Sequence, residues 1–196
     1  MTTAEFNALD SRKQRILVAK DVIAQLKAKK FKATKGTYVA IKDQALSDAV
    51  EESSTEQLHE RFKTIKQCAV CARGAMFMST VRLGNQFQLN QMDTEWNGPI
   101  ATVEAGEVDE RLKSVFASDQ QYLIEAAFEG RDINSQLYEV MTYDDNGSSL
   151  KANIFEDMYN LILAKAKIFY KRYKKSDNRM IAIMKNVIKN KGKFVL

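Results

Sequence analysis

Two cysteines lie three positions apart in this sequence, a spacing that is found in metal sites and in redox pairs. Cys68 and Cys71 are the only cysteines of the 196-residue chain, and His59 is its only histidine. A structural zinc ion takes four ligands, usually pairs of Cys and His. One chain would therefore need a carboxylate as the fourth ligand, and a shared site would need both cysteines from each of two chains. A redox pair needs its first thiol at a helix N-terminus after a strand, whereas an apolar helical pattern runs before Cys68.

We therefore expect two free thiols buried among the small side chains of a helix. Cys68, Cys71 and Gly74 share neighbouring faces of that expected helix with three alanines. Free cysteine behaves as a small apolar residue, and small residues let a neighbouring helix approach closely. On this interpretation the chain holds no metal and no cofactor.

A cluster of basic residues near the C-terminus is the strongest functional pattern. The sequence KAKIFYKRYKKSDNR surrounds Tyr170 and Tyr173 with positive charge. Lysine and arginine neutralise phosphates, and a tyrosine ring can stack on a base, so the pattern predicts contact with nucleic acid or an acidic partner. The alternative is a solvated basic face, because cations also gather at helix C-termini, where they complement the dipole. The candidate contact residues are Lys165, Lys167, Lys171, Arg172, Lys174, Lys175 and Arg179.

Other chemical patterns are incomplete. The run DDNGSS begins like a calcium loop, but Ser149 stands where that loop needs glycine and Phe155 where it needs glutamate. The acid pairs 109–110 and 144–145 could bind magnesium, yet such pairs are common. The sequence contains no G-x-S-x-G elbow, phosphate-binding glycine loop or dinucleotide fingerprint. We identify no catalytic residues and expect a protein that is not an enzyme.

The charge is distributed unevenly along the chain. Residues 1–45 carry ten Lys/Arg and four Asp/Glu, a net +6; residues 46–160 carry nine and twenty, a net −11; residues 161–196 carry eleven and one, a net +10. The three values sum to the overall +5. Either the basic ends pack beside the acidic middle and are partly neutralised, or they form a basic face for a partner.

The composition places the chain among helical cytoplasmic proteins. It has one proline, and that scarcity favours helices over a sandwich or barrel. No apolar run is long enough to span a membrane, and the start lacks the pattern of a secretion signal. Two cysteines without an export signal indicate a reducing cytoplasm. We expect a bacterial cytoplasmic location, no membrane contact and a chain that could form homo-oligomers.

These residues must be positioned by a mainly α (α+β) fold, a single compact helical domain over residues 1–196. A small β-hairpin near residues 31–41 is predicted from two short extended runs around Gly36. We predict a helix from Ser53 or Ser54 through the cysteines to about Val81, and a short strand pair within 84–103. Apolar spacings of three and four residues predict the remaining helices at about 11–27, 108–115, 118–130, 153–175 and 176–192.

Several stretches resemble blocks shared by uncharacterised small accessory proteins of tailed bacteriophages. They are RILVAKDVIAQLKAKKFKATKGTYV, CAVCARGAMFMSTV, RLKSVFASDQQYLIEAAFE and RMIAIMKNVIKNKGKFVL, about half of the chain. The resemblance implies an accessory protein working in a bacterial host, but it carries over no functional residue. Such proteins often bind host machinery, including immunity systems. We therefore expect a non-enzymatic protein that binds and modulates a host protein. The alternatives are a nucleic-acid-binding protein and a nucleotide-binding or nucleotide-degrading one.

Overall fold

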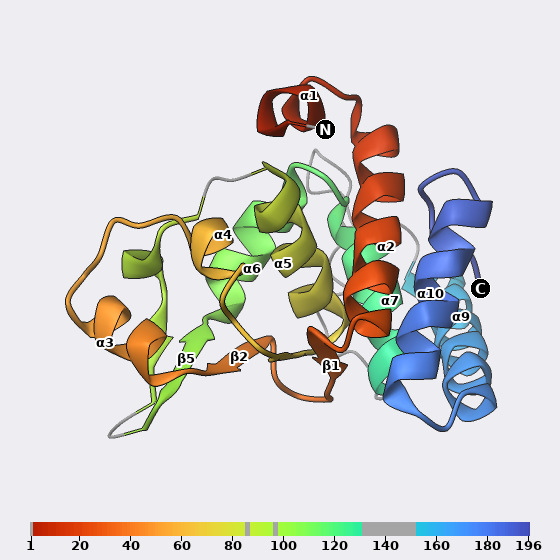
Figure 1. Ribbon diagram of the computed structural model, residues 1–196. Coiled ribbons are helices and arrows are strands. Elements are labelled where there is room, and N and C mark those ends of the chain that lie inside the picture. The colour runs from red at the N-terminus through yellow and green to blue at the C-terminus, as the bar shows by residue number, and fades with distance from the viewer. Residues whose placement is uncertain (1, 85–86, 96–97, 131–151) are drawn as a thin grey trace.

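Helices dominate the structure, and a small sheet lies at one end of them (Figure 1). The computed structural model describes residues 2–84, 87–95, 98–130 and 152–196, and no side chain of 152–159 is described. A mainly α fold with a small amount of β structure was predicted, and it is confirmed. No helix among the described residues is long and apolar enough to cross a membrane.

Most of the predicted helices are present near their predicted bounds. Asp10 caps the first long helix by accepting a hydrogen bond from Lys13 N at 2.9 Å. Gly130 ends another in the left-handed region at φ 70°. Outside the stretch 43–84, the helices of the described residues are α1 (Thr3–Asn7), α2 (Ser11–Lys27), α6 (Ala105–Lys113), α7 (Ser118–Glu129), α9 (Ala152–Arg172) and α10 (Ser176–Lys189).

The sheet contains the predicted strands but not the predicted hairpin. Strands β1 (Phe31–Ala33) and β2 (Val39–Lys42) lie on the two sides of β3 (Cys68–Val70), parallel and antiparallel to it respectively. The direct pairing of β1 with β2 was therefore wrong. The intervening loop spans two inter-strand spacings, about 10 Å, and Thr34 N and Cys71 N close it by donating to Val70 O at 2.8 Å and Thr37 O at 2.7 Å.

The strand pair predicted within 84–103 is confirmed. Strands β4 (Asp93–Thr94) and β5 (Ile100–Val103) pair antiparallel, and β5 also pairs with β2. A 3-10 turn, η1 (Leu89–Gln91), precedes β4. The complete strand order is β1-β3-β2-β5-β4.

The long helix predicted from residue 53 or 54 to 81 is wrong. In its place are a short helix α4 (Leu58–Arg61), then β3, then α5 (Ala72–Gly84). An additional helix, α3 (Gln44–Glu51), precedes them; Asp43 caps it by accepting from Leu46 N at 3.0 Å. The segment 68–70 pairs with a strand on each side, so the sheet overrides its helix-compatible composition.

Helix α5 is the centre of the core. Its residues from Ala72 to Val81 are all buried, and it packs against α1, α2, α4, α6 and α7 as well as against the sheet. A helix that is covered on every side is expected to carry apolar residues around most of its circumference, without a separate polar face. Around it, α2 and α10 lie side by side, and α9 packs against α7 (Figure 1).

Candidate nucleic-acid interface

Six of the seven basic residues predicted as a contact surface are exposed, and the seventh is not. Four lie on α9 and two in the connection to α10, whereas Arg179 lies within α10 and is 2% exposed. The structure thus removes Arg179 from the predicted surface. The exposed residues are Lys165, Lys167, Lys171, Arg172, Lys174 and Lys175.

Arg179 is a structural residue. Its guanidinium donates to Tyr173 O through Nε at 3.0 Å and Nη2 at 2.7 Å, and to Phe128 O through Nη1 at 2.8 Å. It also lies 3.9 Å from the centroid of the Tyr170 ring. Burial lowers the pKa of Arg179, but arginine stays charged at any physiological pH. The charge therefore holds the end of α9 and the end of α7 against α10.

The two tyrosines of the basic run also serve the fold. The Tyr170 ring contacts the charged groups of both Lys35 and Arg179. A Cβ added to Gly130 would lie 2.5 Å from the same ring. The Lys35 ammonium donates to the Tyr170 hydroxyl at 2.7 Å, which lowers the pKa of that phenol. The Tyr173 ring packs on Phe169, centroid to centroid 5.1 Å. Neither ring is presented as a platform for bases.

A second basic surface forms where helices near the two ends of the chain pack together. Helices α2 and α10 run antiparallel: at one end Arg12 and Arg15 donate to Lys191 O at 3.0 Å and Gly192 O at 2.7 Å, and at the other Asp177 accepts from Ala33 N at 2.9 Å. Lys13 of α2 pairs with Asp10, whereas the other lysines of both helices are exposed and form no ion pair between described residues. We call this surface the α2–α10 face and define it as Lys20, Lys27, Lys185 and Lys189.

The carboxylates of these two helices are already engaged. Asp21, the only acidic residue of α2, is 7% exposed and pairs with Arg82, whose Nε lies 2.9 Å from Asp21 Oδ2. Asp177, the only acidic residue of α10, accepts the Ala33 backbone bond. No carboxylate on either helix is therefore left to neutralise the exposed lysines. Lys174 and Lys175 of the predicted set immediately precede α10 and extend the face.

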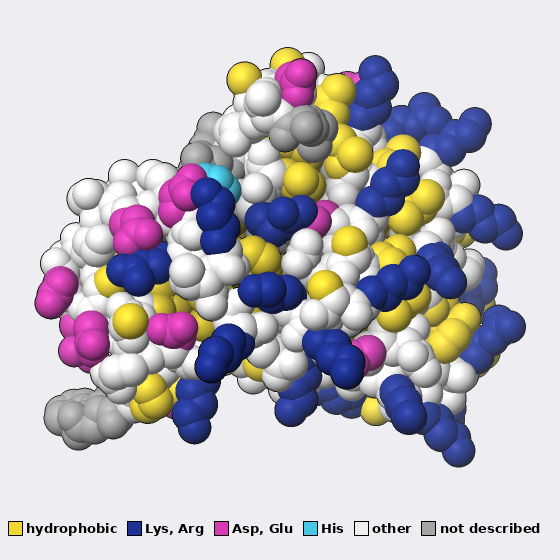
Figure 2. All heavy atoms as spheres, in the orientation of Figure 1, with side chains coloured by type: hydrophobic (Ala, Val, Ile, Leu, Met, Phe, Trp, Pro, Cys, Tyr) yellow, Lys and Arg dark blue, Asp and Glu magenta, His cyan; other side chains and the backbone are white. Residues whose placement is uncertain are grey.

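The acidic side chains gather elsewhere. Figure 2 shows Lys and Arg spread over the region of α2 and α10, whereas most of the visible Asp and Glu lie around α3 and α4. Leaving Lys167 aside, no ion pair between described residues joins a lysine of the two basic ends to a carboxylate of the acidic middle. Partial neutralisation of the ends by the middle, one of the two interpretations of the charge pattern, is seen instead at two arginines: the negative charges of Asp119 and Glu129 oppose the lowering by burial of the pKa of Arg15 and Arg179 respectively.

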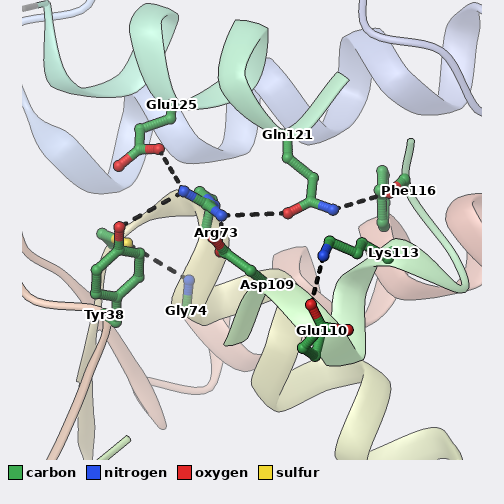
Figure 3. A network of polar contacts seen from close by, with 10 residues as sticks. Tyr38, Arg73, Gly74, Asp109, Glu110, Lys113, Phe116, Gln121 and Glu125 are labelled. Atoms are coloured by element: carbon green, nitrogen blue, oxygen red, sulfur yellow. Dashed lines mark hydrogen bonds and ion pairs between the residues drawn. The ribbon is translucent and has the colours of Figure 1, made fainter. Parts of the chain in front are cut away.

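A cluster of polar side chains surrounds the buried Arg73 on the first turn of α5 (Figure 3). Its side chain is 3% exposed; it pairs with Asp109 of α6 and, at 3.0 Å through Nη1, with Glu125 of α7. Its guanidinium also lies 5.5 Å from the ring centroid of Tyr38 and 5.2 Å from that of Tyr122. The cluster joins α5, α6, α7 and the loop before β2. Arg73, Asp109 and Glu125 therefore each have a charged partner inside the fold.

The cysteines are buried, but not in the helix that was predicted. Cys68 lies in β3, and Cys71 lies between β3 and α5, where its Sγ accepts from Gly74 N at 3.4 Å. Burial raises the pKa of Cys68, and burial together with Glu125 raises that of Cys71 to about 12. The position after a strand and before a helix is one that a redox cysteine needs, yet both thiols are held protonated. The expectation of free, buried thiols is confirmed.

The small residue that matters most beside them is Gly74. A Cβ at this position would lie 1.5 Å from Tyr38 O. The close approach expected of a helix with small residues is thus real, but the neighbour is the backbone of the loop before β2 and not another helix.

The acid pair 109–110 is divided between two separate ion pairs. Asp109 faces Arg73, whereas Glu110 pairs with Lys113 on the surface. No group of three or more His, Cys, Asp or Glu side chains among the described residues could hold a metal ion. The pair 144–145, the DDNGSS turn and part of the predicted 153–175 helix face lie outside the described side chains.

A cavity of about 520 Å³ beside α1 has the size of a ligand site but the wrong charges for a phosphate. Its basic lining residues are His59, Lys63 and Arg82. His59 and Lys63 both pair with Glu60, and Arg82 pairs with Asp21. Because Glu60 already pairs with Lys63 and Asp21 with Arg82, the cavity gives no support to the nucleotide-binding alternative.

The residues that sequence reasoning missed are those of the α2–α10 face. The signal was present in the two basic ends, +6 and +10, but nothing local indicated that the ends would lie side by side. Comparison of the chain with family models, curated proteins and solved structures gave no match.

Proposed function

We propose that this protein binds nucleic acid without catalysing a reaction on it, and that the α2–α10 face is its contact surface. The observation that carries the proposal is the pairing pattern on that face. Exposed lysines from both ends of the chain lie on two adjacent helices whose own carboxylates, Asp21 and Asp177, are engaged elsewhere. Unpaired lysines attract phosphates and release their counterions.

The alternative explanation for these exposed lysines is an ordinary solvated surface that binds no partner. Solvated lysines are usually interspersed with carboxylates, as they are at Lys63 with Glu60 and at Lys113 with Glu110. The α2–α10 face lacks this compensation. Its lysines therefore repel one another across two helices that pack directly together. An anionic partner would relieve that repulsion.

The test is a binding assay with charge-reversal variants. A labelled DNA or RNA oligonucleotide is titrated at low salt with the wild type and with the variant Lys20→Glu/Lys27→Glu/Lys185→Glu/Lys189→Glu. We expect the wild type to bind and the variant to bind at least about tenfold more weakly. Circular dichroism checks that both are folded.

The matched control reverses lysines that already have carboxylate partners. Lys63→Glu/Lys113→Glu removes charges that Glu60 and Glu110 already balance, so binding should fall much less. Absence of wild-type binding at low salt, or equal losses in both variants, contradicts the proposal.

A host protein is the second candidate, because α9 exposes apolar side chains next to its lysines. Leu161 is 56% exposed and Ile168 is 68% exposed, and their seven-residue separation places them on one line of the helix. An apolar protein surface with acidic flanks would match this stripe. Leu161→Glu/Ile168→Glu should then abolish a stoichiometric complex that the four-lysine variant of the α2–α10 face retains; the opposite pattern rejects this candidate.

A further inference from the structure

The α2–α10 face offers phosphate contacts and no base contacts. Every described aromatic side chain is buried or partly buried. Of the two tyrosines nearest the face, Tyr170 is partly buried against Arg179 and Tyr173 against Phe169. Proteins that hold single strands rely on aromatic rings that stack with successive bases, which contributes about 1–3 kcal/mol for each base. The described part of the chain presents no ring for this purpose.

The lysines of the face are held on a rigid frame. Helices α2 and α10 share an apolar seam in which Val18, Val22 and Met184 are fully buried. Their ends are joined by the Arg15 bond to Gly192 O and the Asp177 bond to Ala33 N. Because the two helix backbones are fixed relative to each other, binding a partner whose phosphates are also fixed restricts only the lysine side chains and reorganises neither backbone.

The spacing along α2 suits a regular duplex. Lys20 and Lys27 are seven residues apart, a rise of about 10.5 Å on nearly the same line of the helix. The whole of α2, 17 residues, is about 25 Å long, which equals about seven base pairs at ~3.4 Å each. Lys20 and Lys185 lie within the two helices, and Lys27 and Lys189 are the last residues of α2 and α10. The cations therefore extend along the helix pair and are not gathered at a helix N-terminus.

Binding through phosphates alone depends on counterion release, so the nucleic acid with the higher charge density should bind more tightly. Duplex DNA releases about 0.9 counterion for each phosphate neutralised, and single strands about 0.7. We infer that the α2–α10 face recognises double-stranded nucleic acid by its backbone, independently of sequence, over about seven base pairs. This inference rests on the proposed function and specifies its substrate class.

The experiment compares three labelled DNA probes by fluorescence anisotropy at equal salt. They are a duplex of about 20 base pairs, a second duplex of unrelated sequence and equal length, and one of the single strands. We expect both duplexes to bind equally and at least about tenfold more tightly than the single strand. A shorter series should show affinity falling steeply once the duplex is below about seven base pairs.

The outcomes separate the two proposals. Tighter or equal binding of the single strand, or a strong preference between the duplexes, overturns this inference and leaves the proposed function standing. Binding to none of the probes at low salt overturns both. The variant Lys20→Gln/Lys185→Gln, which changes charge with little change of shape, should lose affinity for both duplexes to the same extent; a loss confined to one duplex also overturns the inference.

Discussion

The Arg73 network and the α2–α10 face both gather charged side chains, but they use the charges in opposite ways. Arg73 is 3% exposed and shares its charge with Asp109 and Glu125. Lys20 and Lys185 are exposed, and no ion pair with a described residue involves them. The difference distinguishes charges that hold the fold from charges that remain available for a partner.

The largest expected effect is on stability, at Arg73. Arg73→Leu leaves Asp109 and Glu125 without their partner and should lower the free energy of unfolding by about 3 kcal/mol. Urea unfolding measures it. The comparison variant Lys20→Leu also removes one cation, but from the surface, and should change stability by less than about 0.5 kcal/mol. Equal losses in the two variants would remove the distinction between the regions.

A somewhat smaller loss is expected at Arg179, which belongs to the fold although its sequence context suggested the surface. Arg179→Met leaves Phe128 O and Tyr173 O without their donor and should cost about 2 kcal/mol. Arg179→Lys should not restore the loss, because an ammonium cannot replace the planar fork. If Arg179→Met kept full stability but lost nucleic-acid affinity, Arg179 would belong to the interface after all.

The buried thiols next to the Arg73 network should make the protein sensitive to alkali. Because the pKa of Cys71 is raised to about 12 from an ordinary 9.0, its contribution is complete below about pH 9 and is lost as the pH rises toward 12. The loss is about 1.4 kcal/mol for each pH unit in that window.

Urea unfolding at pH 7 and pH 10 of the wild type and of Cys71→Ala tests this. The variant should show the smaller alkaline loss and, like Cys68→Ala/Cys71→Ala, the same metal content as the wild type. An identical alkaline loss in both proteins would show that Cys71 ionises freely, and zinc lost with the cysteines would overturn the assignment of a metal-free pair.

The smallest stability effects belong to the face itself. Lys20→Gln/Lys27→Gln/Lys185→Gln/Lys189→Gln should change the free energy of unfolding by less than about 1 kcal/mol in total, since surface changes are individually small. A rise in stability at low salt, which shrinks as salt is added, would be the signature of like-charge repulsion on the face. A large loss would instead show that these lysines hold the fold.

Most helices could be predicted from sequence because their signals are local. Asp10 and Gly130 mark two ends, and apolar spacings mark the faces. The helix α3, which is absent from the predicted elements, has the same kind of local signal in Asp43 followed by buried Leu46, Ala49 and Val50. The strand β3 has none: its pairing partners lie between 27 and 37 residues earlier in the chain, and its small residues fit a helix equally well.

The candidate site shows the same limit. The charge of each chain end can be counted, but the contact of α2 with α10 depends on the tertiary packing of segments about 160 residues apart. The burial of Arg179 likewise follows from carbonyls on α7 and at the end of α9. The modulation of a host protein and the resemblance to bacteriophage accessory proteins stay predictions.

The salt dependence of duplex binding tests the central claim most directly. The logarithm of the binding constant is plotted against that of the salt concentration for the wild type, the four-lysine glutamine variant and Lys63→Gln/Lys113→Gln. If the four lysines contact phosphates, the slope should flatten by about one for each lysine replaced, and the paired-lysine control should keep the wild-type slope. Equal slopes for all three proteins would contradict the assignment of the α2–α10 face.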